Sequence, residues 1–163
     1  MSSHAFLIAR TDALLIAEPA FDAERLRDKD LPGLKQLFID GFGDQPSSGL
    51  STVAAASERV DHLLAGELGQ PWAAAWLGIF EGYGPPVSAI VCTRWRRMPF
   101  IANLVTAPGH RRRGYATSLI REVASLAEQQ GDQAIAMTIK RDSPGANLLA
   151  ELGFSELNSP VGV

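Results

Sequence analysis

The amino-acid sequence predicts an α/β (α+β) fold built on a mixed, mainly antiparallel sheet. Apolar segments at residues 72–80, 87–93 and 98–105 are separated by short turns, and strands joined by tight turns pair antiparallel. The third segment is followed by a helical pattern at 115–130 and by another apolar run at 134–139. Such a strand–helix–strand crossover makes its two strands parallel. Amphipathic segments before and after the strands supply helices that cover the sheet.

The first 22 residues are expected to form an N-terminal extension that packs on the domain of residues 23–163 or on a partner. Two apolar runs, at residues 4–9 and 13–17, flank Thr11 and Asp12. This pattern suggests a hairpin. A single helix stays open as the alternative, because Ala and Leu favour helices.

Two helices are predicted before the strands. Asp30 can cap the first, Pro32 suits its first turn and Gly43 ends it; residues 25–27 form a short strand ahead of it. Ser51 or Thr52 can cap the second, which runs to about residue 68. The side chains predicted to face inward from the second helix are Val53, Val60, Leu63 and Leu64.

The composition is that of an ordinary globular protein. The 163 residues carry a net charge of −3, and no apolar run approaches the roughly 20 residues that span a membrane. The start of the chain lacks a signal-peptide pattern, and a single cysteine suits a reducing compartment. We therefore expect a cytoplasmic protein that engages neither membrane nor nucleic acid. Cys92, in an apolar run, is expected to be a buried structural thiol, and no metal site is predicted.

Charge is distributed unevenly along the chain. Residues 1–90 carry 12 acidic and 6 Lys/Arg residues, whereas residues 91–163 carry 6 acidic and 9 Lys/Arg residues. A basic C-terminal half suits a polyanionic cofactor, and an acidic N-terminal half suits a cationic acceptor. Chance variation in surface charge explains the same numbers, so both interpretations stay open.

The loop between the strand at 98–105 and the helix at 115–130 carries the clearest chemical signal. It reads Pro-Gly-His-Arg-Arg-Arg-Gly-Tyr-Ala from Pro108 to Ala116. The first N–H groups of a helix have no partner within it and attract anions. Gly114 lets the backbone approach a ligand closely, and arginine binds phosphate bidentately. The loop therefore predicts a phosphate or pyrophosphate site, with a solvated basic turn as the alternative.

The spacing Arg-x-x-Gly-x-Ala, formed by Arg111, Gly114 and Ala116 after Pro108, resembles the acetyl-CoA motif of the GNAT superfamily of N-acetyltransferases. The resemblance implies a GNAT-like sheet with helices on both faces and acetyl-CoA as acyl donor. It also implies that the strand before the loop pairs with the pantetheine arm and that the loop amides hold the pyrophosphate. The cofactor-binding residues carried over in this way are Leu104, Val105, Thr106, Arg111, Arg112, Arg113, Gly114, Tyr115 and Ala116.

A second segment, at residues 142–154, resembles the final helix of the family and ends in Leu-Gly-Phe. Asp142 or Ser143 can cap this helix, which is predicted over residues 144–152. Many members have a tyrosine acid on the helix, where this chain has Leu149, and some have a glutamate base where it has Met137. The family's frequent asparagine corresponds to Asp142, so the catalytic residues stay unknown. Side chains that can border the acceptor site, each also an ordinary surface or packing residue, are Asn103, Glu81, Tyr83 and Asp44; His62 is expected to be structural.

The function implied is direct transfer of an acetyl group from acetyl-CoA to a primary amine whose identity is unknown. The alternative is a catalytically weak or inactive GNAT-fold module that binds CoA or regulates. Only nine residues follow Phe154, where the family usually has a further strand and hairpin. Because open strand edges invite association, residues 4–17 are expected to cover the edge, within the chain or in a homodimer.

Overall fold

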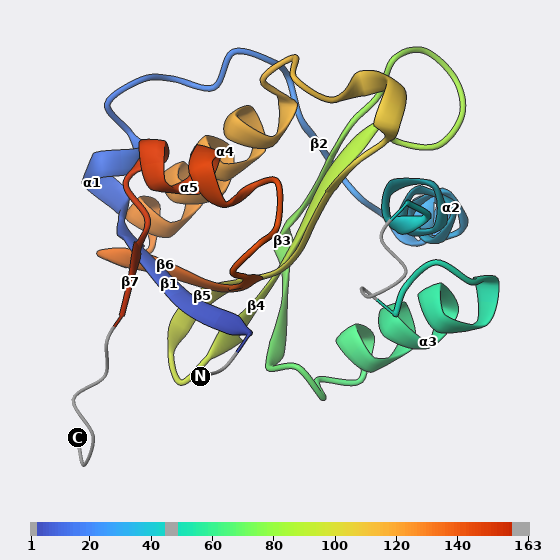
Figure 1. Cartoon of the computed structure of the whole chain (residues 1–163). Coiled ribbons are helices and arrows are strands. Elements are labelled where there is room, and N and C mark those ends of the chain that lie inside the picture. Colours follow the sequence, from blue (N-terminus) through green and yellow to red (C-terminus); the bar gives the residue numbers. More distant parts are fainter. Residues whose placement is uncertain (1–2, 45–48, 158–163) are drawn as a thin grey trace.

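The computed structural model describes residues 3–44 and 49–157 as a seven-stranded sheet with helices on both faces (Figure 1). The strands lie in the order β2-β3-β4-β5-β6-β1-β7. Their bounds are β1 His4–Arg10, β2 Glu24–Arg25, β3 Gln70–Ile79, β4 Ser88–Trp95, β5 Met98–Thr106, β6 Ala134–Lys140 and β7 Ser155–Glu156. The helices are α1 Thr11–Leu14, α2 Leu31–Phe42, α3 Val53–Leu64, α4 Tyr115–Gln129 and α5 Ala146–Leu152. The predicted mixed, mainly antiparallel sheet is confirmed.

Strands β3, β4 and β5 form the antiparallel meander that the short turns predict. The turn between β4 and β5 consists of Arg96 and Arg97, both with left-handed φ values, of 52° and 65°. A register shift follows, because Val91 pairs with Asn103 whereas Cys92 pairs with Ile101. Ala102 is therefore an extra residue, and β5 carries a bulge at this point.

The parallel pairing of β5 with β6 is short. It joins Phe100 to Ala136 and Ile101 to Met137 and then ends. Beyond Ile101 the two strands diverge, and the remaining half of β5 pairs only with β4. The divergence begins at the bulge, so one side of the β5 backbone is left without a strand partner from residue 102 onward.

The N-terminal segment is a strand followed by one helical turn, and neither the predicted hairpin nor the alternative single helix is correct. Strand β1 pairs antiparallel with β6 over its whole length, from His4 opposite Lys140 to Arg10 opposite Ala134. The chain then turns into α1, whose first N–H, from Thr11, donates to the carbonyl of Gln133. Strand β7 pairs with the other edge of β1. The edge of β6 is thus covered from within the chain.

The core consists of two apolar clusters, one on each face of the sheet. On one face, α4 packs against β4 and β5; on the other, α2 and α3 pack against the same strands (Figure 1). A Cβ at Gly41 of α2 would overlap the side chain of Val105, so the close approach of α2 to β5 depends on this glycine. Cys92 is fully buried, as expected, and burial raises the pKa of its thiol.

The predicted cap of α3 is confirmed, but two side chains near the ends of this helix face outward rather than inward. Thr52 does cap α3, since its hydroxyl accepts from the N–H of Ala55 at 3.1 Å. Val53, however, is 74% exposed rather than inward-facing, because it lies at the first position of the helix. Leu64, at the other end, is also exposed. The helix ends there and not near residue 68.

The predicted caps of two other helices are wrong. The carboxylate of Asp30 does not cap α2; it accepts from the N–H of Arg27 at 2.9 Å and closes a preceding 3-10 turn. Helix α5 begins at Ala146, after Gly145, with no side-chain cap. Its end was predicted correctly, because Gly153 adopts the left-handed φ of 114° that stops a helix. No helix within 3–44 and 49–157 is long and apolar enough to cross a membrane.

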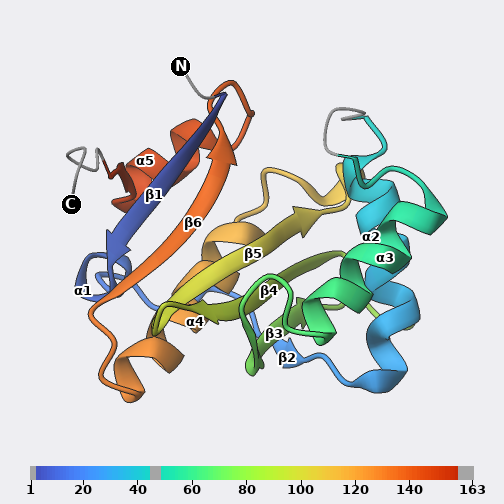
Figure 2. The same cartoon turned by 90° about the horizontal axis from the view of Figure 1, so that it is seen from below.

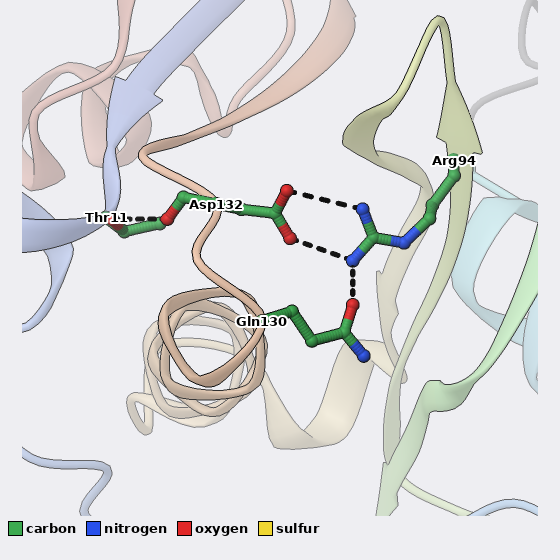
Figure 3. A network of polar contacts seen from close by, with 4 residues as sticks. All are labelled: Thr11, Arg94, Gln130 and Asp132. Atoms are coloured by element: carbon green, nitrogen blue, oxygen red, sulfur yellow. Dashed lines mark hydrogen bonds and ion pairs between the residues drawn. The ribbon is translucent and has the colours of Figure 1, made fainter.

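A polar network ties the far end of α4 to the sheet (Figure 3). The guanidinium of Arg94, on β4, forms an ion pair with Asp132 at 2.8 Å and also contacts the side-chain oxygen of Gln130. The main-chain carbonyl of Asp132 accepts from the hydroxyl of Thr11 at 3.1 Å. Arg94 also lies over the ring of Trp72, 4.5 Å from its centroid. Three segments distant in sequence therefore meet at Asp132, through its carboxylate and its main-chain carbonyl.

We expect the Arg94–Asp132 pair to stabilise the fold. Its side chains are only 24% and 17% exposed, so removing one partner leaves a poorly solvated charge. Arg94→Met should lower the free energy of unfolding by about 2–4 kcal/mol, and Asp132→Asn by less, because the amide keeps one acceptor. Urea unfolding of both variants and the double variant gives the coupling energy. Strictly additive losses would show that the two side chains do not act as a pair.

Candidate functional site

The site begins on the half of β5 that has lost its β6 partner. The N–H of Ala107 donates to the carbonyl of Val87, the residue that precedes β4, at 2.8 Å. Along an antiparallel ladder, hydrogen-bonded pairs alternate with pairs that are not hydrogen-bonded. The register therefore directs the main-chain groups of Val105 at Ala89 of β4. Leu104 and Thr106 occupy the alternate positions, so their N–H and C=O groups point toward the side from which β6 has diverged.

The loop that follows turns the chain sharply into α4. A 3-10 turn at Pro108–His110 opens it, and Gly114 closes it with a left-handed φ of 87° immediately before Tyr115. Arg112 also has a positive φ, of 65°, and is exposed. Helix α4 is 15 residues long, and the N–H groups of its first turn lack partners within the helix. This geometry suits an anion.

Arg111 links the loop to α2 and to β5 through its guanidinium. Its guanidinium pairs with Asp44 at 2.9 Å and donates to the carbonyl of Gly41 at 2.7 Å, while its Nε donates to the carbonyl of Thr106 at 3.3 Å. The charge of Arg111 is therefore balanced by a carboxylate. The side chain positions the loop and satisfies a carbonyl near the end of α2.

Glu81, which follows β3, gathers three side chains of the loop region. His110 lies 3.0 Å from its carboxylate, Arg113 lies 3.2 Å away, and the hydroxyl of Tyr115 donates to it. The hydrogen bond from Tyr115, assisted by His110 and Arg113, holds the pKa of Glu81 below its ordinary value. The same hydrogen bond raises the pKa of Tyr115. Glu81 therefore stabilises the conformation of the loop. The sequence had indicated it only as a possible neighbour of the acceptor.

The N-terminal segment also reaches this loop, which the sequence did not reveal. The ring of Phe21 packs edge-on against Tyr115 with centroids 4.7 Å apart. Its main-chain N–H and carbonyl both bond the hydroxyl of Ser118 in the first turn of α4, at 3.0 and 3.1 Å. A Cβ built on Gly114 would lie 3.6 Å from the Phe21 ring, an ordinary contact.

The side chains that replace the expected acid and base are apolar and buried. Leu149 is 3% exposed and Met137 7%, and both belong to the core cluster under α4. Tyr83 is fully exposed. His62 lies at the surface near Glu58 and Glu67, as expected for a structural residue. None of these side chains is placed beside the unpaired half of β5 as an acid or base.

Asn103 is the acceptor-side candidate that does lie at the divergence of β5 and β6. It is buried, and its side-chain oxygen accepts from Nε of Arg59 at 2.9 Å. A second nitrogen of Arg59, Nη2, donates to the carbonyl of Ala102 in the bulge at 3.1 Å. The sequence offered no signal for Arg59, because it is 44 residues from its partner and lies among ordinary helical residues.

The fold defined by this diverging pair of strands and the loop into α4 is that of the GNAT N-acetyltransferases, and comparison with solved structures agrees. A GCN5-related N-acetyltransferase from Sphaerobacter thermophilus superposes with a TM-score of 0.69 over 94% of this chain and 48% of its own, at 15% identity. The chain thus spans about half the length of that protein. At such identity the likeness concerns the fold.

Two shorter proteins are covered almost completely. An aminoglycoside 6'-N-acetyltransferase from Acinetobacter haemolyticus gives a TM-score of 0.63 at 19% identity, over 88% of this chain and 97% of its own. PaiA N-acetyltransferase from Thermoplasma acidophilum, solved with coenzyme A, gives 0.63 at 12% identity, over 82% and 89%. No curated protein sequence gives a significant match.

Sequence comparison identifies the family directly. The model of the family described as FR47-like protein matches residues 76–161, which is more than half of the chain. The protein therefore belongs to the FR47-like family, within the GNAT superfamily.

Proposed function

We propose that this protein is an acetyl-CoA-dependent N-acetyltransferase that moves the acetyl group directly to a primary amine. The observation that supports the proposal most strongly is that two binding features lie next to each other in the chain. The half of β5 whose main-chain groups lack a β6 partner leads straight into a loop that presents the N-terminus of α4. An extended amide-containing arm and a pyrophosphate, as in CoA, match these two features in order.

In this proposal the cofactor is held mainly by the backbone. The N–H groups from residue 114 onward would bind the pyrophosphate, and the main chain at Leu104 and the N–H of Thr106 would pair with the pantetheine arm. Arg111 and Arg113 are already paired with Asp44 and Glu81, so they hold the loop in shape more than they neutralise phosphate. The crystal structure of the Thermoplasma relative contains coenzyme A, which supports this choice of cofactor.

The chemistry asks little of the side chains. Bringing thioester and neutral amine into attack geometry lowers the barrier greatly, and a main-chain N–H can polarise the thioester carbonyl. The register directs the main chain of Val105 at β4 and that of Leu104 away from it, so we assign this task to the N–H of Leu104. Thiolate is a fair leaving group, since a thiol pKa is about 8.5, and it can depart without a tyrosine on α5.

A second candidate is a CoA-binding or regulatory module without substantial turnover. The burial of Leu149 and Met137 in the core favours it, because neither side chain can transfer a proton. Both candidates require CoA binding, so measured acetyl transfer to an amine separates them.

The expected pH profile tests the mechanism. With a panel of primary amines, the acetyl-transfer rate should rise with pH toward the pKa of the amine, because only the neutral amine attacks, and then level off. A fall at high pH would contradict this and indicate a tyrosine acid. Tyr115 would then be the candidate, since exposed Tyr83 lies outside the site, and Tyr83→Phe serves as the control that leaves the profile unchanged.

A further inference from the structure

Arg59 lies at the point where β5 leaves β6 and has no acidic partner among the residues described. It projects from α3, is half-buried, and donates two hydrogen bonds, one to the side chain of Asn103 and one to the carbonyl of Ala102. The only influence that shifts its pKa is burial, which lowers it. Two of the three arginines of the loop differ in this respect, since Arg111 and Arg113 are each matched with a carboxylate.

A half-buried guanidinium without a counter-ion is costly to keep. The guanidinium has five N–H groups in a planar fork, and the two bonds to Asn103 and Ala102 leave the others for a ligand. A carboxylate fits such a fork bidentately. A phosphate dianion would call for more positive charge, and within the described residues Arg59 is the one basic side chain bonded to Asn103 and to the carbonyl of Ala102.

The position of Arg59 relates it to the reacting atoms. The carbonyl that it contacts belongs to the bulge residue Ala102, two residues before the N–H of Leu104 that we assign to the thioester carbonyl. Consecutive strand residues advance about 3.3 Å. An anion at Arg59 therefore lies within the length of a small molecule from the acetyl group.

We infer that the acceptor is a small amine that carries its own carboxylate, such as an amino acid, and that Arg59 binds this carboxylate. The inference rests on the proposed acetyltransferase function and deepens it. In such a molecule the amine and the carboxylate are separated by few bonds, as the spacing between Arg59 and Leu104 requires. Asn103 orients the guanidinium and acts as a positioning residue.

The arrangement argues against the cationic acceptor that the acidic N-terminal half suggested. Two of its carboxylates, Asp44 and Glu81, are engaged with arginines of the loop, so they are not available to attract a cation. On the face that carries α2 and α3, no described helix covers β1 or β6 (Figure 2). The half-exposed ring of Phe100, paired with Phe6 at 6.3 Å, lies there. A small acceptor can approach Arg59 from this side.

The test compares matched amines in an acetyl-CoA turnover assay with the full chain. Phenylalanine, phenylalaninamide and phenethylamine share a benzyl group, but beside the amine they carry a carboxylate, an amide and a hydrogen, respectively. After correction for the neutral amine fraction, we expect kcat/KM for phenylalanine to exceed that of the amide about tenfold or more. Arg59→Met should abolish this preference, Arg59→Lys should keep part of it, and exposed Arg96→Met should leave it unchanged.

A binding measurement separates the inference from the proposed function. Calorimetric titration of the CoA-saturated protein with N-acetylphenylalanine should show binding that Arg59→Met loses, while CoA affinity stays the same. Turnover of amines without preference for a carboxylate overturns the inference and leaves the acetyltransferase function standing. Absence of turnover with every amine overturns the function, and the titration then decides about the carboxylate subsite. N-acetylphenylalanine binding that is equal in Arg59→Met and parent would refute the subsite.

Discussion

Gly114→Val should weaken CoA binding about tenfold to hundredfold, which corresponds to about 1.4–2.8 kcal/mol, whereas Arg112→Ala should change it little. Two physical effects act in the glycine variant. Gly114 has a φ of 87°, a conformation that valine adopts only at a cost of about 1–2 kcal/mol. In the proposed binding mode, the added side chain would also lie beside the N–H groups that the pyrophosphate approaches, with its Cβ 3.6 Å from the ring of Phe21. Arg112, in contrast, contributes one exposed and replaceable charge.

The matched control is Gly131→Val, at the other end of α4. Gly131 has a φ of 83°, and a Cβ there meets nothing within 4 Å, so this variant carries the same backbone strain away from the loop. Calorimetric titration with CoA should show a loss for Gly114→Val only, although both variants melt at a lower temperature. Equal CoA affinity in Gly114→Val and the parent would show that the anion site is not at this loop.

Deleting residues 2–18 should cause aggregation or a change of oligomeric state and a large loss of thermal stability. The deletion removes β1, which pairs with β6 over seven residues and with β7 on its other edge. It also removes Leu14, a fully buried side chain of the core under α4. Strand β6 would become an open edge next to exposed apolar surface, and such edges associate. Size-exclusion chromatography and a melting curve measure both effects.

A peptide of residues 2–18 supplied in trans gives the control for this experiment. The native peptide should restore the elution volume, because its backbone can reform the ladder with β6. A peptide with Leu7→Asp and Ala9→Asp should not, since both side chains face the core under α4. A truncated protein with unchanged size and melting temperature would mean that β1 does not hold the sheet together.

Local sequence was sufficient for the unit from β5 through α4. Its strand is mostly apolar, its helix has apolar residues at helical spacing, and Gly114 stands at the turn with a positive φ. The meander of β3, β4 and β5 was equally readable, because connections of a few residues leave antiparallel pairing as the only choice. The same holds for Gly153 at the end of α5. In each case the deciding interactions lie within a few residues of one another.

The N-terminal segment shows what local sequence left open. Its residues are compatible with strand and helix, and its outcome depends on β6, which lies more than 120 residues further along the chain. The hydrogen bond from Thr11 to Gln133 and the burial of Leu14 against α4 then turn the chain into α1. Intrinsic preferences of a few tenths of a kcal/mol per residue are smaller than such tertiary contributions.

Charge pairing was likewise decided by the tertiary structure. The sequence determined that three arginines stand at the start of α4, but it did not show that Asp44 and Glu81 would pair with two of them. It also did not show that Arg59 would reach the bulge at Ala102 without a carboxylate. Whether a charge is balanced depends on which side chains the fold brings within a few ångströms and how far it excludes water. Those distances arise only when α2 and α3 pack against β5 and Glu81 of the β3–β4 turn meets the loop before α4.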